Sequence, residues 1–331
     1  MQLARLLTLL LVWSLIATGT ALAETPQKGP EVIKVGVFIS NLFDVDFARQ
    51  DVGAQFWVWY NHMDPSFDPK AGIEIVNARS SEVQDNIRAD MGGGRIWDQV
   101  KYATVLDQNW DVANYPFDRQ KIKLVIESTY DDARKLKFEA DVEGTKLRRD
   151  LTLAGWKIES LRIFAANELY ETSYGDPTMS PVGPSIYPRV TIEIDVKRNG
   201  WRLLLSTFIG FGLAIALAGI VLTSSAFRRL SEVIDIGAHL AVGTGALFST
   251  IGAGYILQSG LPPTTTFGLA DAFQLTAFSV TFLTMLLIFA LHVLRKWRMR
   301  EAAVKTGRIF FLLYLICVAA ITVRVWIAVV S

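Results

Sequence analysis

The chain has 331 residues, half of them hydrophobic, and a formal net charge of +1. A chain this close to neutral has no electrostatic basis for binding nucleic acid, so we exclude that partner. The single cysteine, Cys317, leaves no intrachain disulfide and no cysteine-based metal site, and the three histidines follow no metal-ligand spacing. A phosphate-binding glycine loop, a nucleophile elbow and an HExxH motif are also absent from the sequence. We therefore expect no enzyme activity, no cofactor and no metal site.

Residues 1–23 have the features of a signal peptide. Arg5 supplies a positive charge, the run from Leu6 to Ile16 is apolar, and Ala21-Leu22-Ala23 has the small-x-small pattern that signal peptidase cleaves. An uncleaved anchor helix is the alternative.

Residues 24–199 are predicted to form an all-β domain. Apolar residues alternate with polar ones, or gather in short β-branched and aromatic runs, at 32–39, 52–60, 121–126 and 189–196. Turn-forming residues separate these runs, and no long amphipathic helix is evident. Many short strands with this spacing are typical of a β-sandwich, and we expect an immunoglobulin-like one.

Residues 200–331 are predicted to form an all-α bundle of four transmembrane helices. Apolar runs of about twenty residues, long enough to cross a bilayer, occupy 203–222, 236–257, 272–294 and 309–330. Four buried core helices are excluded because the runs are too long and are hydrophobic on all sides.

The charges between the spans predict the orientation. The first and third connections are basic, whereas the second, from Ser259 to Ala270, has no charged residue; the basic residues are Arg228, Arg229, Arg295, Lys296, Arg298, Arg300, Lys305 and Arg308. Positive loops stay in the cytoplasm. The N-terminal domain and the C-terminus are therefore expected outside the cytoplasm. Trp201, Trp297 and Trp326 stand at span ends, as interfacial anchors do.

The second span differs from the other three in its small residues. It contains Gly237, Gly243, Gly245, Gly252 and Gly254, and each interior glycine costs about 1 kcal/mol of helix propensity relative to alanine. Close packing inside a bundle explains such a helix. From composition alone we slightly favour this explanation. A helix that lines water in a ring of subunits is the alternative, because cyclic assembly would place the least lipid-like helix on the axis.

Several motifs in order resemble the Cys-loop receptor superfamily of pentameric ligand-gated ion channels, in its prokaryotic form. Tyr115-Pro116-Phe117-Asp118 is similar to the aromatic-Pro-x-Asp loop of the family, without its two flanking cysteines. Gly155-Trp156, Tyr170, Tyr174-Gly175 and Tyr187-Pro188-Arg189 look like the strands beside the loop that caps the agonist site. Ile194 to Arg198 matches the last strand before the first span, and Leu261-Pro262 matches the loop between the second and third spans.

The resemblance implies a homopentamer in the bacterial inner membrane. Its partners would be membrane lipid and the permeating ions, and its agonist would be a small ligand or a proton. Counting back from Leu261 gives the pore-lining face: Ala241, Gly245, Phe248, Gly252, Tyr255 and Ser259. A register one residue away would instead turn Leu240, Thr244, Leu247 and Ile251 inward. Phe248 would then not be the central gate. A non-conducting sensor with the same fold is the alternative function.

The resemblance also implies which residues couple and bind. Coupling residues would be Tyr115, Pro116, Asp118, Arg198, Leu261 and Pro262. Agonist-site residues on one side would be Asn77, Arg79, Glu127, Tyr130, Asp131, Tyr170, Tyr174 and Tyr187, and Trp59, Trp97 and Tyr102 would face them from the neighbour. Aromatic rings there favour a cationic amine. Glu232 and Asp235, at the inner end of the second span, weakly favour cations as the permeating ions.

Overall fold

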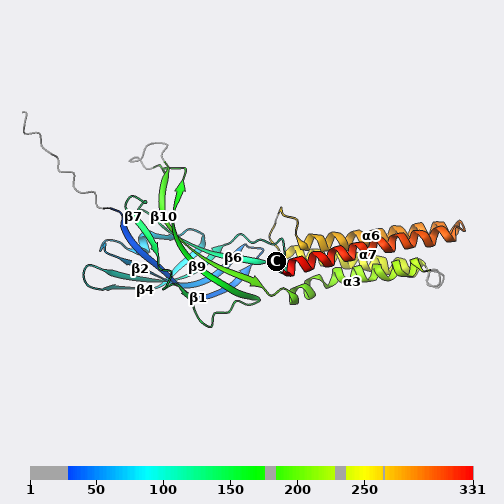
Figure 1. The fold of residues 1–331 in the computed structure, drawn as a ribbon, viewed down its shortest axis with the longest axis horizontal. Coiled ribbons are helices and arrows are strands. Elements are labelled where there is room, and N and C mark those ends of the chain that lie inside the picture. Colours follow the sequence, from blue (N-terminus) through cyan, green and yellow to red (C-terminus); the bar gives the residue numbers. More distant parts are fainter. Residues whose placement is uncertain (1–28, 176–183, 228–235, 264, 331) are drawn as a thin grey trace, which may run out of the picture.

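The computed structural model describes residues 29–175, 184–227, 236–263 and 265–330. A β-rich domain forms one end of an elongated molecule, and a bundle of long helices projects from it (Figure 1). The predicted signal peptide lies outside the described residues, as do Glu232 and Asp235.

In the described part of the β-rich domain, ten strands form two sheets and one short helix lies between β2 and β3. The first sheet has the order β4-β5-β2-β1-β7, with β8 also paired to β1, and the second has the order β3-β6-β10-β9. The strands are β1 (Glu31–Asp46), β2 (Asp51–His62), β3 (Ile73–Ile75), β4 (Ala78–Asp90), β5 (Ile96–Asp107), β6 (Arg119–Ser128), β7 (Leu136–Ala140), β8 (Lys146–Leu147), β9 (Trp156–Tyr170) and β10 (Ser185–Arg198), and α2 spans Pro69–Gly72. The predicted strand runs fall within β1, β2, β6 and β10.

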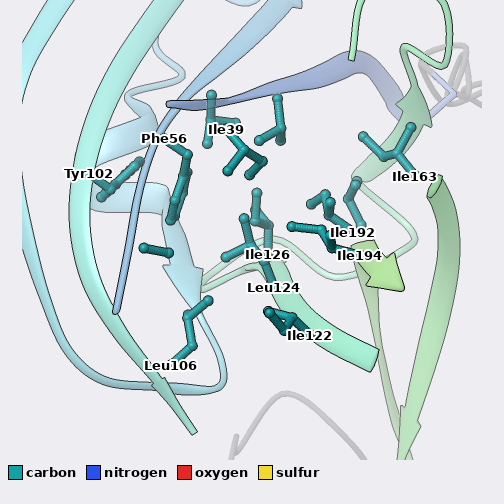
Figure 2. Packing of buried hydrophobic residues seen from close by; sticks show 14 of the residues in the cluster. Ile39, Phe56, Tyr102, Leu106, Ile122, Leu124, Ile126, Ile163, Ile192 and Ile194 are labelled. Atoms are coloured by element: carbon teal, nitrogen blue, oxygen red, sulfur yellow. The ribbon is translucent and has the colours of Figure 1, made fainter. Parts of the chain in front are cut away.

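The core of this domain lies between the two sheets (Figure 2). Strand β10 illustrates how the sequence pattern makes it: Val190, Ile192, Ile194 and Val196 are all buried, because alternate side chains of a strand point to the same face. Partners from the opposite sheet include Phe56 and Ile39. The domain is thus sandwich-like, and its immunoglobulin-like topology remains a prediction.

The four helices are α3 (Trp201–Ala226), α5 (Ile236–Ser259), α6 (Leu269–Lys296) and α7 (Arg300–Val330). Each is long and apolar enough to cross a membrane, and α5 is the least apolar of them. The four predicted spans fall inside these helices. The chain is therefore a multi-pass membrane protein by helix length and composition.

Candidate functional site

A single loop, residues 108–118 between β5 and β6, connects the β domain to three of the helices. It accepts a hydrogen bond from the first residue of α6, Leu269 N to Ala113 O, at 2.8 Å. The ring of Phe117 packs edge-on against Trp201 of α3, with centroids 5.1 Å apart. The side chain of Arg324 in α7 reaches the same loop. The loop therefore contacts α3, α6 and α7.

Arg198, the last residue of β10, is held above this loop by charge and by aromatic rings. Its Nε donates to Oδ1 of Asp118 at 2.7 Å, and its Nη2 donates to Oδ2 at 3.2 Å. The guanidinium also lies 4.1 Å from the ring centroid of Trp156 and 4.3 Å from that of Phe47. The pair is almost fully buried, so removing one charge would leave the other uncompensated.

The predicted coupling residues gather at this junction. The Arg198 guanidinium lies over Tyr115, 5.0 Å from the centroid of the tyrosine ring. The Tyr115–Pro116 peptide bond is cis. Tyr115 and Leu261 both pack against the β-sandwich core and against the cluster between α3, α5 and α6. Pro262 is buried beside Leu261. Gly200 passes so close to the Pro116 carbonyl that no Cβ would fit.

Helix α5 has one buried face and one exposed face. The residues packed inside the chain are His239, Gly243, Ala246, Thr250, Ala253, Gly254 and Leu257. The six predicted pore-lining residues, Ala241, Gly245, Phe248, Gly252, Tyr255 and Ser259, are all exposed. Each follows a buried residue by two positions, which is about 200° around a helix. The predicted stripe therefore lies opposite the packed face, with Phe248 69% exposed and Tyr255 77% exposed.

The alternative stripe lies on the flank of α5. Leu240, Thr244 and Ile251 are exposed and Leu247 is half-buried. Each of these four follows a buried residue by one position, about 100° around the helix. His239, at the inner end, is buried and shares a hydrogen bond of 2.7 Å between its Nε2 and Ser224 Oγ of α3. It is part of the packing between α3 and α5.

A cavity of about 660 Å³ lies between the outer halves of α5 and α6. Its walls include Tyr255 and the polar side chains of Gln258, Asp271 and Gln274. Polar groups exposed directly to lipid hydrocarbon are costly. This side of the helix pair is therefore poorly suited to face lipid alone.

The predicted agonist-site residues Glu127 and Tyr170 meet around Arg189, on strands β6, β9 and β10. Arg189 Nε donates to Glu127 Oε2 at 2.8 Å, and its Nη2 donates to the Tyr170 hydroxyl at 2.8 Å. The Tyr170 hydroxyl in turn donates to Glu127 Oε1 at 2.8 Å. Burial, followed by the bond to Glu127, raises the pKa of Tyr170 to about 12. Glu168 adds a second ion pair to Arg189 at 3.0 Å.

Three tyrosines form an edge-to-face group beside this ion pair. The ring centroid of Tyr170 lies 5.5 Å from that of Tyr174 and 6.0 Å from that of Tyr187, and the last two are 6.3 Å apart. Tyr174 is exposed, whereas Tyr170 and Tyr187 are half-buried. Tyr130 is also exposed, whereas Asp131 pairs with Lys135 at 3.7 Å. An aromatic surface next to a carboxylate is suited to a cation.

Glu74 is a member of this region that the sequence does not identify. It lies directly opposite Glu127 in the pairing of β3 with β6. Burial, and then the negative charge of Glu127, raises the pKa of Glu74. Its pairing register depends on two strands about fifty residues apart, so no local pattern marks it. The Tyr187-Pro188-Arg189 motif does contain Arg189, whose role as the central cation was not predicted.

Asn77 and Arg79 lie apart from the tyrosine group. The Asn77 amide joins strands β5 and β6, because its Nδ2 donates to Asp107 O at 3.1 Å and to Lys123 O at 2.9 Å, while its Oδ1 accepts from Val125 N. Arg79 forms ion pairs with Asp51 and Asp107. Asn77 therefore connects the two sheets, whereas Arg79 connects strands β4, β2 and β5 within the first sheet.

The three aromatic residues predicted to face a neighbour have different surroundings. Tyr102 is 6% exposed and its ring packs 5.7 Å from that of Phe56, so it belongs to the core of its own domain. Trp59 lies across Gly36, and its Nε1 donates to Asp141 Oδ2 at 3.1 Å. Trp97 is half-buried on β5. We therefore leave Tyr102 out of the proposed site.

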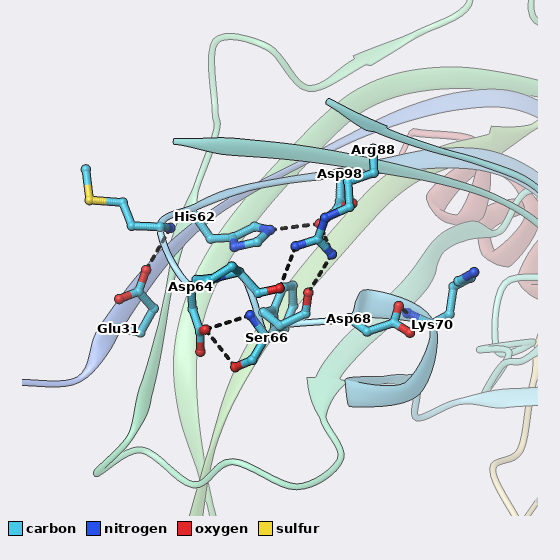
Figure 3. Close-up of polar contacts among 11 residues, drawn as sticks. Glu31, His62, Asp64, Ser66, Asp68, Lys70, Arg88 and Asp98 are labelled. Atoms are coloured by element: carbon cyan, nitrogen blue, oxygen red, sulfur yellow. Dashed lines mark hydrogen bonds and ion pairs between the residues drawn. The ribbon is translucent and has the colours of Figure 1, made fainter. Parts of the chain in front are cut away.

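A further polar cluster lies at the C-terminal end of β2, the end opposite Asp51 (Figure 3). His62 Nε2 lies 2.8 Å from Asp98 Oδ2, and Arg88 lies 3.5 Å from the same oxygen. Arg88 also donates to the carbonyls of Pro65 and Phe67, at 2.9 and 3.0 Å. These bonds hold the 63–68 segment against the sheet, and we assign the cluster a structural role.

No family model matches the chain, and no curated protein matches it. Its β-rich N-terminal domain followed by four apolar helices agrees with the architecture that the sequence motifs imply. Among the residues that the structure describes, no three His, Cys, Asp or Glu side chains could together hold a metal ion.

Proposed function

We propose that the chain is one subunit of a homopentameric ligand-gated ion channel of the Cys-loop receptor type. The observation that carries the proposal is the geometry of α5. Its exposed stripe of Ala241, Gly245, Phe248, Gly252, Tyr255 and Ser259 lies opposite the face that packs inside the subunit. In a ring of five subunits, this stripe would surround the axis, where Phe248 forms a hydrophobic constriction that closes the pore by excluding water.

The polar lining between α5 and α6 supports an oligomer. Gln274 lies within the predicted third span and would be covered by the adjacent subunit in a ring, whereas a lone subunit would present it to lipid. Gln258 and Asp271 line the same cavity at the outer end of the spans. A contact between two different faces closes into a ring when the rotation is a fraction of a full turn. The same arrangement would bring neighbouring β domains side by side.

The agonist site of the proposed channel is the group of Glu127, Tyr170, Tyr174, Tyr187 and Arg189. Its aromatic rings and the Glu127 carboxylate suit a small cationic amine as the agonist. Binding of a proton at this group is the second candidate for the opening signal. Ligand binding would displace the 108–118 loop, which already contacts three helices. The ligand then shifts a closed–open equilibrium by its differential affinity for the two states.

The proposed location is the bacterial inner membrane, with the β domain and the C-terminus outside the cytoplasm. The basic connection between α6 and α7 supports this orientation. The C-terminal end of α7 lies beside the β domain (Figure 1), which supports a common side of the membrane for the two. The acidic residues Glu232 and Asp235 in the sequence before α5 support cations as the permeating ions.

The decisive experiment is current recording from the purified chain in planar bilayers, with pH, calcium and a panel of small amines varied in turn. A ligand-dependent current is expected, and reversal potentials in asymmetric salt would give the permeating ion. Absence of current under every condition would favour the alternative, a non-conducting sensor with the same architecture. Imaging of the solubilised particle would count the subunits independently.

A further inference from the structure

The turn between α6 and α7, at the end of the bundle away from the β domain, carries a dense positive charge (Figure 1). Six basic residues and one acidic residue, Glu301, lie between positions 295 and 308; the basic ones are Arg295, Lys296, Arg298, Arg300, Lys305 and Arg308. All six side chains are exposed. Within the part of the chain that the structure describes, none of the six has an ion-pair partner.

The turn is short and is closed by backbone hydrogen bonds. Met299 N donates to Leu294 O at 2.9 Å and Arg298 N donates to Arg295 O at 3.0 Å, the two bonds that end a helix in a Schellman motif. Arg298 adopts φ of 58° at the position where glycine is usual. Helix α7 begins at once, since Ala303 N donates to Met299 O. The basic side chains are therefore presented by two helix ends and not by a loose loop.

Helix length places these charges at the depth of lipid headgroups. The 28 residues of α6 extend about 42 Å, longer than the roughly 30 Å hydrocarbon core of a bilayer. A core that begins near Ala272 ends about twenty residues later, near Leu291. Arg295 then lies about 6 Å beyond it, within the headgroup layer. Trp297, 69% exposed at the tip, is the residue type that prefers this layer.

We propose that the α6–α7 turn binds the phosphate groups of anionic phospholipids in the leaflet opposite the β domain. Arginine pairs with phosphate through parallel hydrogen bonds, and basic clusters next to a membrane span attract anionic lipid. The depth of Arg295, within the headgroup layer, favours lipid over a soluble acidic protein as the partner. The inference requires only that the four helices cross the membrane, so it stands or falls separately from conduction.

The test uses the full-length protein purified in detergent. It is incubated with equimolar phosphatidylglycerol and phosphatidylcholine of identical acyl chains and then repurified. Mass spectrometry gives the ratio of the two lipids retained. The wild type is expected to enrich phosphatidylglycerol, and Arg300→Gln to reduce the enrichment by up to about fivefold. The triple variant Arg298→Gln, Arg300→Gln, Lys305→Gln is expected to bring the ratio close to one.

Two variants control for position and folding. Arg202→Gln removes an exposed arginine from the first turn of α3, at the other end of the bundle, and should keep the wild-type ratio. Arg298→Gly removes a charge while placing glycine at a φ that suits it, so it should fold at least as well and still lower the ratio.

Three results would overturn the proposal. The first is a wild-type ratio of one, and the second is a triple variant that keeps the wild-type ratio. The third is displacement of phosphatidylglycerol by an equal concentration of inorganic phosphate, which would assign the cluster to free phosphate. A triple variant that retained lipid but lost binding to polyglutamate would make the turn a docking site for an acidic protein instead.

Discussion

The guanidinium of Arg324, near the end of the chain, donates two hydrogen bonds of 3.1 Å to Oδ1 of Asn114, a residue 210 positions earlier. An arginine near the end of a membrane span usually extends out of the hydrocarbon towards the headgroups. The Arg324 side chain extends in this direction and reaches the β domain. The last helix is thereby tied to the same 108–118 loop that contacts α3 and α6.

This tie can be measured with a double-mutant cycle. Arg324→Ala and Asn114→Ala should each destabilise the protein by about 1–3 kcal/mol, because hydrogen bonds to a charged group are stronger than neutral ones. The double variant should be little worse than the poorer single variant, when thermal unfolding in detergent is compared. A cycle that pairs Asn114→Ala with Arg202→Ala should be additive. If the effects of Arg324→Ala and Asn114→Ala on stability were also additive, the hydrogen bonds between these residues would contribute nothing to stability.

The buried pair of Arg198 and Asp118 should be far more sensitive to charge removal. The Asp118 side chain is 2% exposed, so Asp118→Asn leaves the Arg198 guanidinium without a counterion in a buried site. We therefore expect the free energy of unfolding to fall by about 3–5 kcal/mol. The matched control is Asp150→Asn, which breaks the exposed pair with Arg148 and should cost about 1 kcal/mol or less. Equal melting temperatures for the two variants would contradict this ranking.

The raised pKa of Glu74 predicts a pH-dependent stability with a definite sign. A carboxyl group whose pKa is higher in the folded than in the unfolded state stabilises the fold when protonated, and loses that stability as pH rises through the raised value. Ionised Glu74, opposite Glu127, therefore destabilises the fold at neutral pH. Because Glu74 is exposed to solvent, screening makes the effect small.

Glu74→Gln should consequently raise the melting temperature at pH 7, and the gain should shrink to zero at pH 4 and below. Melting curves over this range check the prediction. Glu143→Gln, at an exposed turn position, serves as the control and should show no such pH-dependent gain. A gain from Glu74→Gln that grew towards low pH would have the wrong sign and would refute the assignment.

Local pattern predicted the elements but not the long-range partners. The alternation in 189–196 and the apolar runs of the four spans each occupy contiguous residues, so β10 and the membrane helices could be recognised from sequence alone. The placement of Tyr102 could not, because a strand aromatic can face the core or a neighbour with the same spacing. Glu74 and Arg324 act through partners about fifty and 210 residues away, which only the pairing register and the tertiary contacts reveal.

Glycines of α3 offer a test of helix packing within the bundle. A Cβ on Gly210 would lie 2.8 Å from the Ala253 Cβ of α5, whereas one on Gly212 would meet nothing within 4 Å. Gly210→Ala must separate α3 from α5 and should cost about 1–3 kcal/mol. Gly212→Ala should be neutral or stabilising by up to about 1 kcal/mol. Thermal unfolding of the two variants compares them directly, and a similar loss for both would argue against this packing.

The register of the pore is tested by introducing cysteines on α5, since the chain has only Cys317 to replace first. In a Cys317→Ala background, Phe248→Cys and Tyr255→Cys should react with a water-soluble thiol reagent that alters the current. Leu257→Cys, on the packed face, should not react.

The gate itself distinguishes the two registers. Phe248→Ser should ease opening, because a polar side chain at the constriction lowers the cost of wetting it. Leu247→Ser should change opening less, since Leu247 lies on the flank of the helix and is half-buried. Dose–response curves of the two variants measure the difference. If Leu247→Ser eases opening and Phe248→Ser does not, the stripe is displaced by one residue and Leu240, Thr244, Leu247 and Ile251 line the pore.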